Sequence, residues 1–474
     1  MEEWLSRLLE DARKRYGPVE LKSINGRHYL YRVRSVYDAE KKRARKVSGE
    51  YIGRVTEEGL APTKKRERTV YEYANARLLR LLMDDALQGL RKCFPSEWRE
   101  IAALSIVRAI RNVPIKYVKD AWEKLYLCGE IEASLSPNTV SERLRSVGAD
   151  WEAQRSFFLS LMDGQSVFFY DLSSIFSRSA NLSLAEKGYN KEHLFLDQVN
   201  FSLLFSQEKK APVMLKPMPG SIRDVKSLRS VMDEFPLKKC IIILDRGFYS
   251  IKIMAALLSL GTSFIQPLRR NSKLIDYSLE PDRLFAYRGR GIKYAVKELQ
   301  LGDRRARLLL YEDVLLRGEE HSNLIKLRLA DGDEETDQPA AEIDERSLGK
   351  ISILTDLDWG GDRIYGLYKE KEDIEQAFDA MKNELENDKS CLGDDDAVRG
   401  YFFVSFLSLY LYFRVLERIR EAGLAGKISV NELLFQLSKV YLIKYGDGKE
   451  RLSEVPSKVE GLISKLNIDI LPKN

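Results

Sequence analysis

The sequence predicts an α/β core that is interrupted by a β-rich insertion and preceded by a mainly helical region. Short apolar runs alternate with helical segments in residues 166–271, which is typical of an α/β core. Short alternating runs in residues 272–348 predict the insertion, and helical apolar spacing in residues 70–160 predicts packed helices. A chain of 474 residues is too long for one hydrophobic core, so several domains are expected.

Composition places the chain among soluble globular proteins, with 44% hydrophobic and 31% charged residues. The net charge is +5, but residues 1–70 alone hold 18 Lys and Arg against 11 Asp and Glu. The basic clusters are Lys41–Lys46 and Lys64–Arg68. Runs of this kind are either solvated loops or nucleic-acid contacts, and charge alone does not decide between them.

Neither a membrane segment nor a secretory signal is predicted. The first ten residues form a charged amphipathic helix, and the apolar run Tyr401–Phe413 is shorter than the roughly 20 residues that a membrane span requires. The four cysteines and three histidines are scattered, so no zinc site or disulfide framework is expected. These features favour a cytoplasmic protein.

The N-terminal part predicts a small sheet and then helices. Residues 27–37 alternate polar and apolar side chains, and the run 50–55 follows a basic loop, which indicates a β-hairpin with a basic tip. Further on, Ser136 is placed to cap a helix with Pro137 at its first position, and Arg143 and Arg145 follow. This segment is either the recognition helix of a helix-turn-helix or a plain short helix.

The α/β part places two aspartates after apolar strands. The predicted strands are Val167–Tyr170, Val199–Phe205, Pro212–Lys216, Cys240–Leu244 and Ser263–Leu268, with helices Val225–Phe235 and Ser250–Leu260. Asp171 and Asp245 follow the first and fourth of these strands. Sites in α/β sheets form at the carboxyl ends of strands, although an aspartate there is also a common turn or cap residue.

The remaining elements are predicted from local patterns. Strands of the insertion are expected at Leu284–Tyr287, Lys293–Val296, Ala306–Tyr311 and Leu324–Leu329. A strand at Ile351–Thr355, a helix from about Asp362, an apolar helix at 401–420 and a helical segment at Val430–Tyr441 complete the core. Beyond Tyr445 we expect a weakly ordered charged tail. The predicted regions are 1–69 (basic β-hairpin), 70–160 (helical DNA-binding domain), 161–271 (first core part), 272–348 (insertion), 349–445 (second core part) and 446–474 (tail).

One stretch, Tyr368–Lys382, predicts an amphipathic helix. A polar stripe and an apolar stripe run along it at helical spacing. The polar stripe consists of Tyr368, Lys371, Glu375 and Lys382. On its own, this is the pattern of an ordinary surface helix with a solvated Glu375. Two strand-end aspartates and a glutamate on a later helix are, however, the oxygen ligands that two divalent metal ions need.

These residues also resemble a known family. The spacing Tyr368-x2-Lys371-x3-Glu375-x6-Lys382 is similar to the Tyr-x2-Arg-x3-Glu-x6-Lys signature of DDE transposases encoded by insertion sequences of the insertion sequence four superfamily. Further matching segments are Tyr170–Ser174, Leu244–Ser250 with its Asp-Arg-Gly-Phe core, Pro219–Ser221 with Asp224, Leu354–Thr355 and Arg399–Phe403. The resemblance extends in order over about Tyr29 to Tyr412.

The resemblance implies a ribonuclease H-like catalytic core. Asp171, Asp245 and Glu375 would be catalytic residues that bind two Mg²⁺ ions, for which Mn²⁺ can substitute. Lys371 and Lys382 would contact DNA phosphates, and Tyr368 the terminal nucleotides. Arg246, beside a metal ligand, is a further candidate phosphate contact. The partner would be double-stranded DNA, both at the transposon ends and at the target. A homodimer would bind it in the synaptic complex. The protein would be located in the prokaryotic cytoplasm, associated with the nucleoid.

Two positions depart from the family pattern. Lys371 stands where the signature has arginine, so a bidentate phosphate contact is lost while the charge remains. The insertion has no tryptophan, so a flipped base would have to stack on another ring. The rings available are Tyr277, Phe285, Tyr287 and Tyr294. The hairpin-ended cleavage intermediate of some relatives therefore does not carry over directly.

The sequence thus predicts a DNA transposase that binds inverted repeats, cleaves DNA with metal ions and joins the freed 3′-hydroxyl to target DNA. One alternative is a ribonuclease H-like nuclease without strand transfer. Another is a non-catalytic descendant that only binds DNA.

Overall fold

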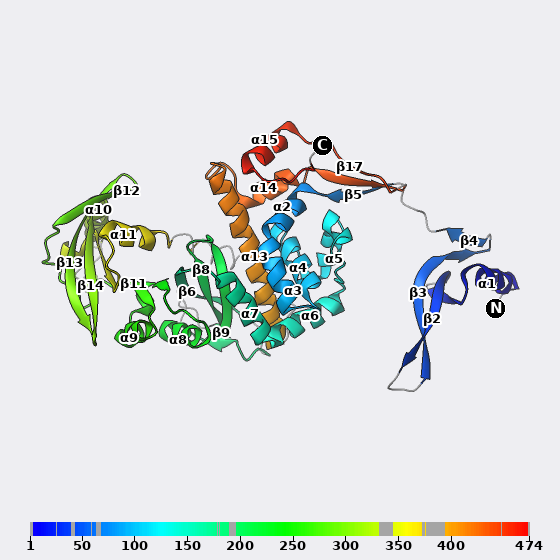
Figure 1. Cartoon of the computed structure of the whole chain (residues 1–474), viewed down its shortest axis with the longest axis horizontal. Helices are drawn as coiled ribbons and strands as arrows, with labels where there is room; N and C mark the ends of the chain where they lie inside the picture. Colours follow the sequence, from blue (N-terminus) through cyan, green and yellow to red (C-terminus); the bar gives the residue numbers. More distant parts are fainter. Residues whose placement is uncertain are drawn as a thin grey trace. The chain divides into compact units, whose positions relative to one another are not determined.

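The structure is a computed structural model that describes most of the chain. The described residues are 3–24, 26–38, 43–57, 59–62, 68–177, 179, 181–188, 196–330, 345–371, 375, 394–446 and 448–472. The chain divides into two compact units, one of residues 1–70 with 443–452 and one of residues 71–442 with 453–474. Figure 1 shows the elements along the chain. Among the described residues, no helix is long and apolar enough to cross a membrane.

The first unit holds a four-stranded antiparallel sheet in the order β1-β2-β3-β4. Its elements are α1 (Glu3–Tyr16), β1 (Val19–Ile24), β2 (Arg27–Asp38), β3 (Arg43–Thr56) and β4 (Gly59–Pro62). The predicted hairpin is confirmed, but β3 begins at Arg43, inside the segment that we expected to be the basic loop. Cross-strand pairing extends to Asp38 and Arg43, so only residues between these two connect the strands.

The helical part of the second unit begins after a short strand. This strand is β5 (Arg68–Glu72), which spans the boundary of the two units. The helices are α2 (Ala74–Leu82), α3 (Asp84–Cys93), α4 (Trp98–Ile110), α5 (Val118–Trp122), α6 (Pro137–Ala149) and α7 (Trp151–Met162), with 3-10 turns at Ile115–Tyr117 and Tyr126–Gly129. The predicted cap of α6 is confirmed, because the Thr139 N–H donates to Ser136 Oγ at 3.2 Å. Arg145 on this helix pairs with Asp394 at 2.7 Å, and Arg143 lies 3.8 Å from Glu97. In this structure α6 is a packed helix of the bundle.

The α/β part is built on a mixed ten-stranded sheet. Its first elements are β6 (Val167–Phe176), β7 (Glu186–Lys187), β8 (Asp197–Ser206), β9 (Ala211–Pro219), α8 (Asp224–Glu234), β10 (Ile241–Ile243), α9 (Ile251–Ser259) and β11 (Ser263–Pro267), with a 3-10 turn at Arg246–Phe248. The strands and helices predicted for residues 167–268 are confirmed. Strand β6 pairs with β10 in parallel and with β8 antiparallel, and β8 pairs with β9.

The insertion extends the same sheet. Its elements and those that follow are β12 (Arg283–Tyr287), β13 (Arg290–Leu301), β14 (Arg304–Asp313), α10 (Val314–Ala330), a 3-10 turn at Glu345–Ser347, β15 (Lys350–Thr355) and α11 (Gly361–Lys369). The sheet order is β12-β13-β14-β15-β11-β10-β6-β8-β7. The predicted strand Leu324–Leu329 is wrong, because these residues belong to helix α10. Asp313 starts this helix by accepting hydrogen bonds from the N–H groups of Leu315 and Leu316, both at 3.0 Å.

The C-terminal part is ordered rather than a tail. Its elements are α13 (Asp395–Glu421), α14 (Val430–Leu437), β16 (Tyr441–Tyr445), β17 (Glu450–Leu452) and α15 (Ser457–Leu466). The prediction of a weakly ordered segment beyond Tyr445 is wrong. Strands β17, β16 and β5 form a sheet, and α15 buries Val459, Ile463 and Leu466 despite its many charged residues. An apolar residue every three or four positions is enough to hold a charged helix on a core.

Helix α13 is the centre of the second unit. Figure 1 shows it between the helices α2–α7 and the strands β6, β8 and β9. Towards the sheet, Phe402 packs on Phe201 with ring centroids 5.5 Å apart. Towards the helices, Phe403 packs on Phe157 at 5.3 Å and on Phe94 at 5.1 Å. The long apolar run that is too short for a membrane is therefore a buried helix, as predicted.

Helices α6 and α13 approach so closely that only glycine fits at two positions. A Cβ added to Gly148 would lie 1.7 Å from the Asp396 carbonyl oxygen, and one added to Gly400 would lie 1.9 Å from the Leu144 carbonyl oxygen. Both obstacles are backbone atoms, which cannot rotate away as a side chain can.

We predict that Gly400→Ala lowers the free energy of unfolding by about 3 kcal/mol, since the helices must move apart. Urea unfolding followed by circular dichroism measures the change. The control is Gly461→Ala in α15, where no atom lies within 4 Å of the added Cβ. Because alanine favours helices, the control should be neutral or stabilising by up to about 1 kcal/mol. Equal stability of the two variants would contradict the close packing.

Candidate active site

The two predicted aspartates stand at the same level of two neighbouring strands of the central sheet. The parallel register of β6 and β10 ends at the pair Phe169 and Ile243. Two residues further along each strand stand Asp171 and Asp245. Residues at the same level of neighbouring parallel strands point to the same face, so we expect the two carboxylates to lie on one side of the sheet. Both side chains are half-buried.

Asp171 differs from its prediction in one respect. It is not at the end of its strand, because β6 continues to Phe176 while paired with β8. Only the pairing with β10 stops before it. The Asp171 carboxylate accepts a hydrogen bond from the Leu172 N–H at 2.8 Å. The side chain is thus held where β6 leaves β10 and continues along β8.

Asp245 is the N-cap residue of the 3-10 turn Arg246–Phe248. Packing explains why the matched Asp-Arg-Gly-Phe segment has glycine and phenylalanine at its last two positions. The Phe248 ring is buried against Tyr170, the neighbour of Asp171, with centroids 5.2 Å apart. A Cβ on Gly247 would lie 2.5 Å from Asp224 Oδ2, so a side chain there would displace that carboxylate. Behind the turn, the buried Gln266 donates its Nε2 hydrogens to the carbonyl oxygens of Asp245 and Pro267 at 2.8 and 2.7 Å.

Asp224, which the sequence singled out only within the family match, is a further carboxylate near Asp245. It is the first residue of α8, with the N-cap at Arg223. Burial, and then the negative charge of Asp245, raise the pKa of the Asp224 carboxyl above its usual range. The Ser227 hydroxyl connects the carbonyl oxygen of Asp224 to the Tyr170 hydroxyl, with bonds of 2.7 and 2.9 Å. Negative charge is therefore concentrated beside Asp245.

A cation already faces this acidic group. Lys371 Nζ lies 2.9 Å from Asp245 Oδ1. Only 10% of the Lys371 side chain is exposed, against 42% for Asp245. We predicted that Lys371 contacts DNA phosphates, whereas in this structure it pairs with a predicted metal ligand. The Asp245 carboxylate therefore stabilises a positive charge at the position of the Lys371 ammonium group.

The predicted signature helix is not one uninterrupted helix. Helix α11 ends at Lys369, directly after Tyr368, and a turn at Glu370 and Lys371 follows. Glu375 is again helical, because its N–H donates to the Lys371 carbonyl oxygen at 3.4 Å. Its side chain is exposed. Glu375 therefore lies one helical turn beyond the residue that contacts Asp245.

The other predicted site residues have separate positions. Tyr368 is half-buried, and Arg246 is exposed in the turn beside Asp245. Lys382 lies outside the described residues, as do Phe378 and Met381 in the same stretch. Within the described part of the chain, no three His, Cys, Asp or Glu side chains form a group that could hold a metal ion. The described residues thus hold Asp171 and Asp245 at the same level of neighbouring strands but contain no ready group of three metal ligands.

The rings considered for base stacking are mostly packed. Phe285 contacts Tyr294 at 5.8 Å and Tyr365 of α11 at 5.5 Å, and Tyr287 contacts Tyr365 at 5.3 Å. Tyr277 donates its hydroxyl to the Arg270 carbonyl oxygen at 2.9 Å. These contacts attach the insertion to α11, the helix that leads to Lys371.

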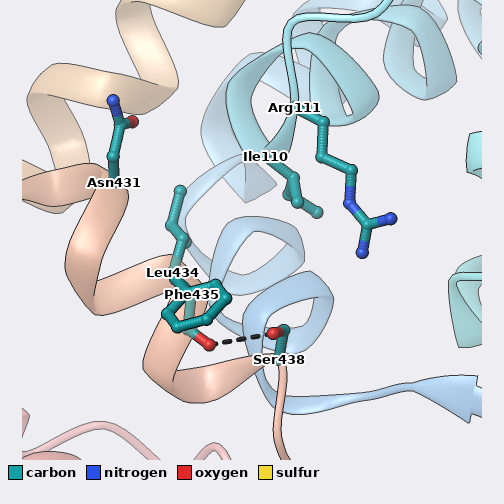
Figure 2. A pocket seen from close by; sticks show the side chains of 6 residues that line it. All are labelled: Ile110, Arg111, Asn431, Leu434, Phe435 and Ser438. Carbon is teal, nitrogen blue, oxygen red and sulfur yellow. Dashed lines mark hydrogen bonds between the residues drawn. The ribbon is translucent and has the colours of Figure 1, made fainter.

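A pocket of about 370 Å³ lies elsewhere, between the end of α4 and α14 (Figure 2). It is lined by Ile110, Arg111, Asn431, Leu434, Phe435 and Ser438. Its lining has one cation and no carboxylate, and Arg111 pairs with Glu72. Such a lining supplies neither metal ligands nor a general base, so the aspartate edge is the better candidate for an active site.

A large part of this chain matches a known protein family. Residues 161–411 match the model of the family described as the transposase DDE domain. No curated protein matches the sequence. Similar solved structures include a piggyBac transposase synaptic complex with hairpin DNA, at 10% identity and a TM-score of 0.39, covering 77% of this chain and 79% of that one. A Mos1 transposase paired-end complex with left transposon end has 14% identity and a TM-score of 0.15, with 43% and 59% covered. At these scores neither structure defines the fold of this chain.

We predict that Asp224→Asn in metal-free buffer raises the free energy of unfolding at pH 7. The folded chain binds a proton on Asp224 more tightly than the unfolded chain does, because the pKa of this carboxyl is raised. Stability from this group is therefore lost as pH rises from the usual aspartate pKa through the raised one. Asparagine does not ionise, so the variant does not lose this stability as the pH rises. Urea unfolding at several pH values between 4 and 7 measures the difference in the free energy of unfolding.

The control is Asp233→Asn, an exposed carboxylate on the same helix. It removes the same charge but should leave the pH dependence of the urea midpoint as in the wild type. If Asp224→Asn and Asp233→Asn give parallel pH profiles, the crowding of Asp224 and Asp245 is refuted.

Proposed function

This chain belongs to the transposase DDE domain family, and on that basis we propose that it is a DNA transposase of an insertion sequence in the insertion sequence four superfamily. It would bind the inverted-repeat ends of the element, cleave DNA strands in a metal-dependent reaction and transfer the freed ends to target DNA. The observation that supports the proposal is the parallel register of β6 and β10, since Asp171 and Asp245 each stand two residues after its last pair and both lie within the family segment.

We further propose that the core is ribonuclease H-like. Strands β9, β8 and β6 are antiparallel neighbours, and β6, β10 and β11 are parallel neighbours, which gives the order β9-β8-β6-β10-β11. Helix α8 precedes β10 and helix α9 follows it. Asp171 lies on the third strand of this order, β6, and Asp245 follows the fourth, β10. This topology supports the proposal for residues 161–271 and 349–445, with the insertion 272–348 extending the sheet beyond β15.

The carboxylates fit a divalent metal centre of two Mg²⁺ ions, for which Mn²⁺ can substitute. Asp171 and Asp245 offer hard oxygen ligands from neighbouring strands, and the Lys371 ammonium at 2.9 Å marks where a cation is stabilised. We propose Glu375 as the ligand that completes the set. When bound, such ions supply Lewis acid catalysis at the phosphate.

The residues of the chain itself would position the DNA. The β6–β10 register would hold Asp171 and Asp245 at the same level of the sheet, while the buried Gln266 fixes the backbone of Asp245 by a hydrogen bond to its carbonyl oxygen. Release of Lys371 from Asp245 would free a compact cation for the phosphate beside the cut. Tyr368, Arg246 and Lys382 are proposed as further DNA contacts, Tyr368 at the terminal nucleotides and the two cations at phosphates.

The partners follow from this reaction. Double-stranded DNA is bound both as transposon end and as target, and a homodimer would hold two ends together in the synaptic complex. The proposed location is the prokaryotic cytoplasm, in association with the nucleoid. No observation favours the nuclease or the non-catalytic alternative over a transposase.

We predict that Asp171→Asn, Asp245→Asn and Glu375→Gln each reduce strand cleavage with Mg²⁺ about a thousandfold, since each removes a ligand charge worth several kcal/mol of transition-state stabilisation. Duplex binding should survive, because the substitutions remove negative charge from the site. The assay uses labelled duplexes that carry the element ends, and joined products distinguish strand transfer from simple hydrolysis. Wild-type cleavage by any one variant would exclude that residue as a metal ligand. Cleavage without joined products would favour the nuclease alternative.

A further inference from the structure

The small sheet of the first unit has two different faces. Helix α1 covers one of them, where Leu5, Leu9 and Ala12 pack on three strand residues. These strand residues are Val19, Leu30 and Val55, each less than 9% exposed. The side chains that alternate with them along β1, β2 and β3 belong to the opposite face.

Three tyrosines form a cluster on that opposite face. Tyr29 and Tyr31 stand on either side of the buried Leu30 in β2, and Tyr51 of β3 is the register partner of Tyr31. The Tyr51 ring lies 6.2 Å from that of Tyr29 and 5.4 Å from that of Tyr31. Tyr51 remains 37% exposed. A set of aromatic rings at a solvent-exposed sheet face is unusual unless the face contacts a partner.

Cationic side chains flank the tyrosines. Tyr29 is paired in register with Lys22 on one side and Arg54 on the other, so the three form a row across β1, β2 and β3. Lys22 Nζ lies 5.0 Å from the centre of the Tyr31 ring, and Arg54 is exposed. Glu20, the register partner of Tyr31 on β1, is an acid on this face. Charge in the first 70 residues is nevertheless strongly basic, with 18 Lys and Arg against 11 Asp and Glu.

Beyond this row the sheet narrows to a two-stranded ribbon. Pairing of β1 ends at Arg32, whereas β2 and β3 remain paired from Val33 and Ser48 to Asp38 and Arg43. Figure 1 shows these two strands extending together past the rest of the sheet. The sequence of the ribbon is basic, with Arg34, Arg43, Arg45 and Lys46. A two-stranded ribbon fits the major groove of B-DNA, which is about 12 Å wide.

We propose that this face and ribbon bind duplex DNA, with the ribbon in the major groove and the row Lys22, Tyr29 and Arg54 on the phosphates beside it. This inference rests on the proposed function and names the surface of the first unit that contacts the DNA. Cations and tyrosine hydroxyls are the side-chain groups that phosphate oxygens attract. Stacking of unpaired bases is disfavoured, because Lys22 lies over the Tyr31 ring and the three rings pack on one another at 51° and 54°.

The test compares full-length variants in a fluorescence anisotropy assay with a labelled 30-base-pair duplex at several salt concentrations. One double variant, which carries Lys22→Gln and Arg54→Gln, removes two positive charges from the proposed surface. Arg13→Gln with Lys14→Gln removes two exposed charges from helix α1, which covers the other face. Circular dichroism spectra and thermal midpoints establish that both proteins fold.

We expect the Lys22 and Arg54 variant to bind the duplex about tenfold more weakly at 0.1 M salt and to lower the slope of log K against log salt by roughly 2, since each phosphate contact contributes about 0.9. The Arg13 and Lys14 variant should bind as the wild type does. Equal affinity and slope for the two variants would overturn the inference. Tighter binding of a single strand of the same length, with the same loss in the Lys22 and Arg54 variant, would overturn the duplex assignment.

Cleavage measured in the same preparations separates this inference from the proposed function. If the wild type cuts DNA with Mg²⁺ and the Lys22 and Arg54 variant binds normally, only the surface assignment fails. If binding depends on Lys22 and Arg54 but no preparation cuts, the catalytic proposal fails and the DNA-binding surface stands.

Discussion

The parallel pairing of β6 with β10 is the constraint on which the rest of the structure depends. A shift by one residue in this register would put one aspartate on the opposite face of the sheet. The register is maintained by the apolar side chains below it, since Phe168, Phe169, Ile242 and Ile243 are all at most 2% exposed. Helix α13 supports the sheet through the rings of Phe402 and Phe413, which pack on β8. The apolar core below Asp171 and Asp245 thus fixes the backbone positions of these two residues.

Much of the α/β part could be predicted from the sequence because its signals are local. Runs such as Val167–Tyr170 and Cys240–Leu244 are short, apolar and bounded by polar residues, and the structure has β6 and β10 there. The predicted strand Leu324–Leu329 failed because its alternation is equally compatible with a helix, and Asp313 eleven residues earlier decides between them by capping α10. The C-terminal segment is folded because β16 pairs with β5 and α15 packs on α13, and both of these partners lie outside the segment itself. No local pattern contains that information.

The site was predictable in part for the same reason. Asp171 and Asp245 each follow a recognisable apolar run, and the parallel pairing of these two runs puts both residues at the same level of the sheet. The ion pair of Lys371 with Asp245 joins residues 126 positions apart, and the proximity of Asp224 to Asp245 depends on how α8 packs over the 3-10 turn. Helical spacing also could not reveal the end of α11 at Lys369, since the periodicity of Tyr368–Lys382 continues past the turn.

The aromatic residues of the insertion have a structural role that limits any second role in DNA binding. Phe285, Tyr287 and Tyr311 pack on Tyr365 of α11, and the Tyr311 hydroxyl donates to the Gly361 carbonyl oxygen at 2.8 Å. Because α11 leads directly to Tyr368 and Lys371, the insertion supports the segment that approaches Asp245. A base that stacked on Phe285 or Tyr287 would have to separate them from Tyr365, and would thereby loosen α11. Any coupling of the insertion to catalysis would therefore act through the position of Lys371 and, one helical turn further, of Glu375.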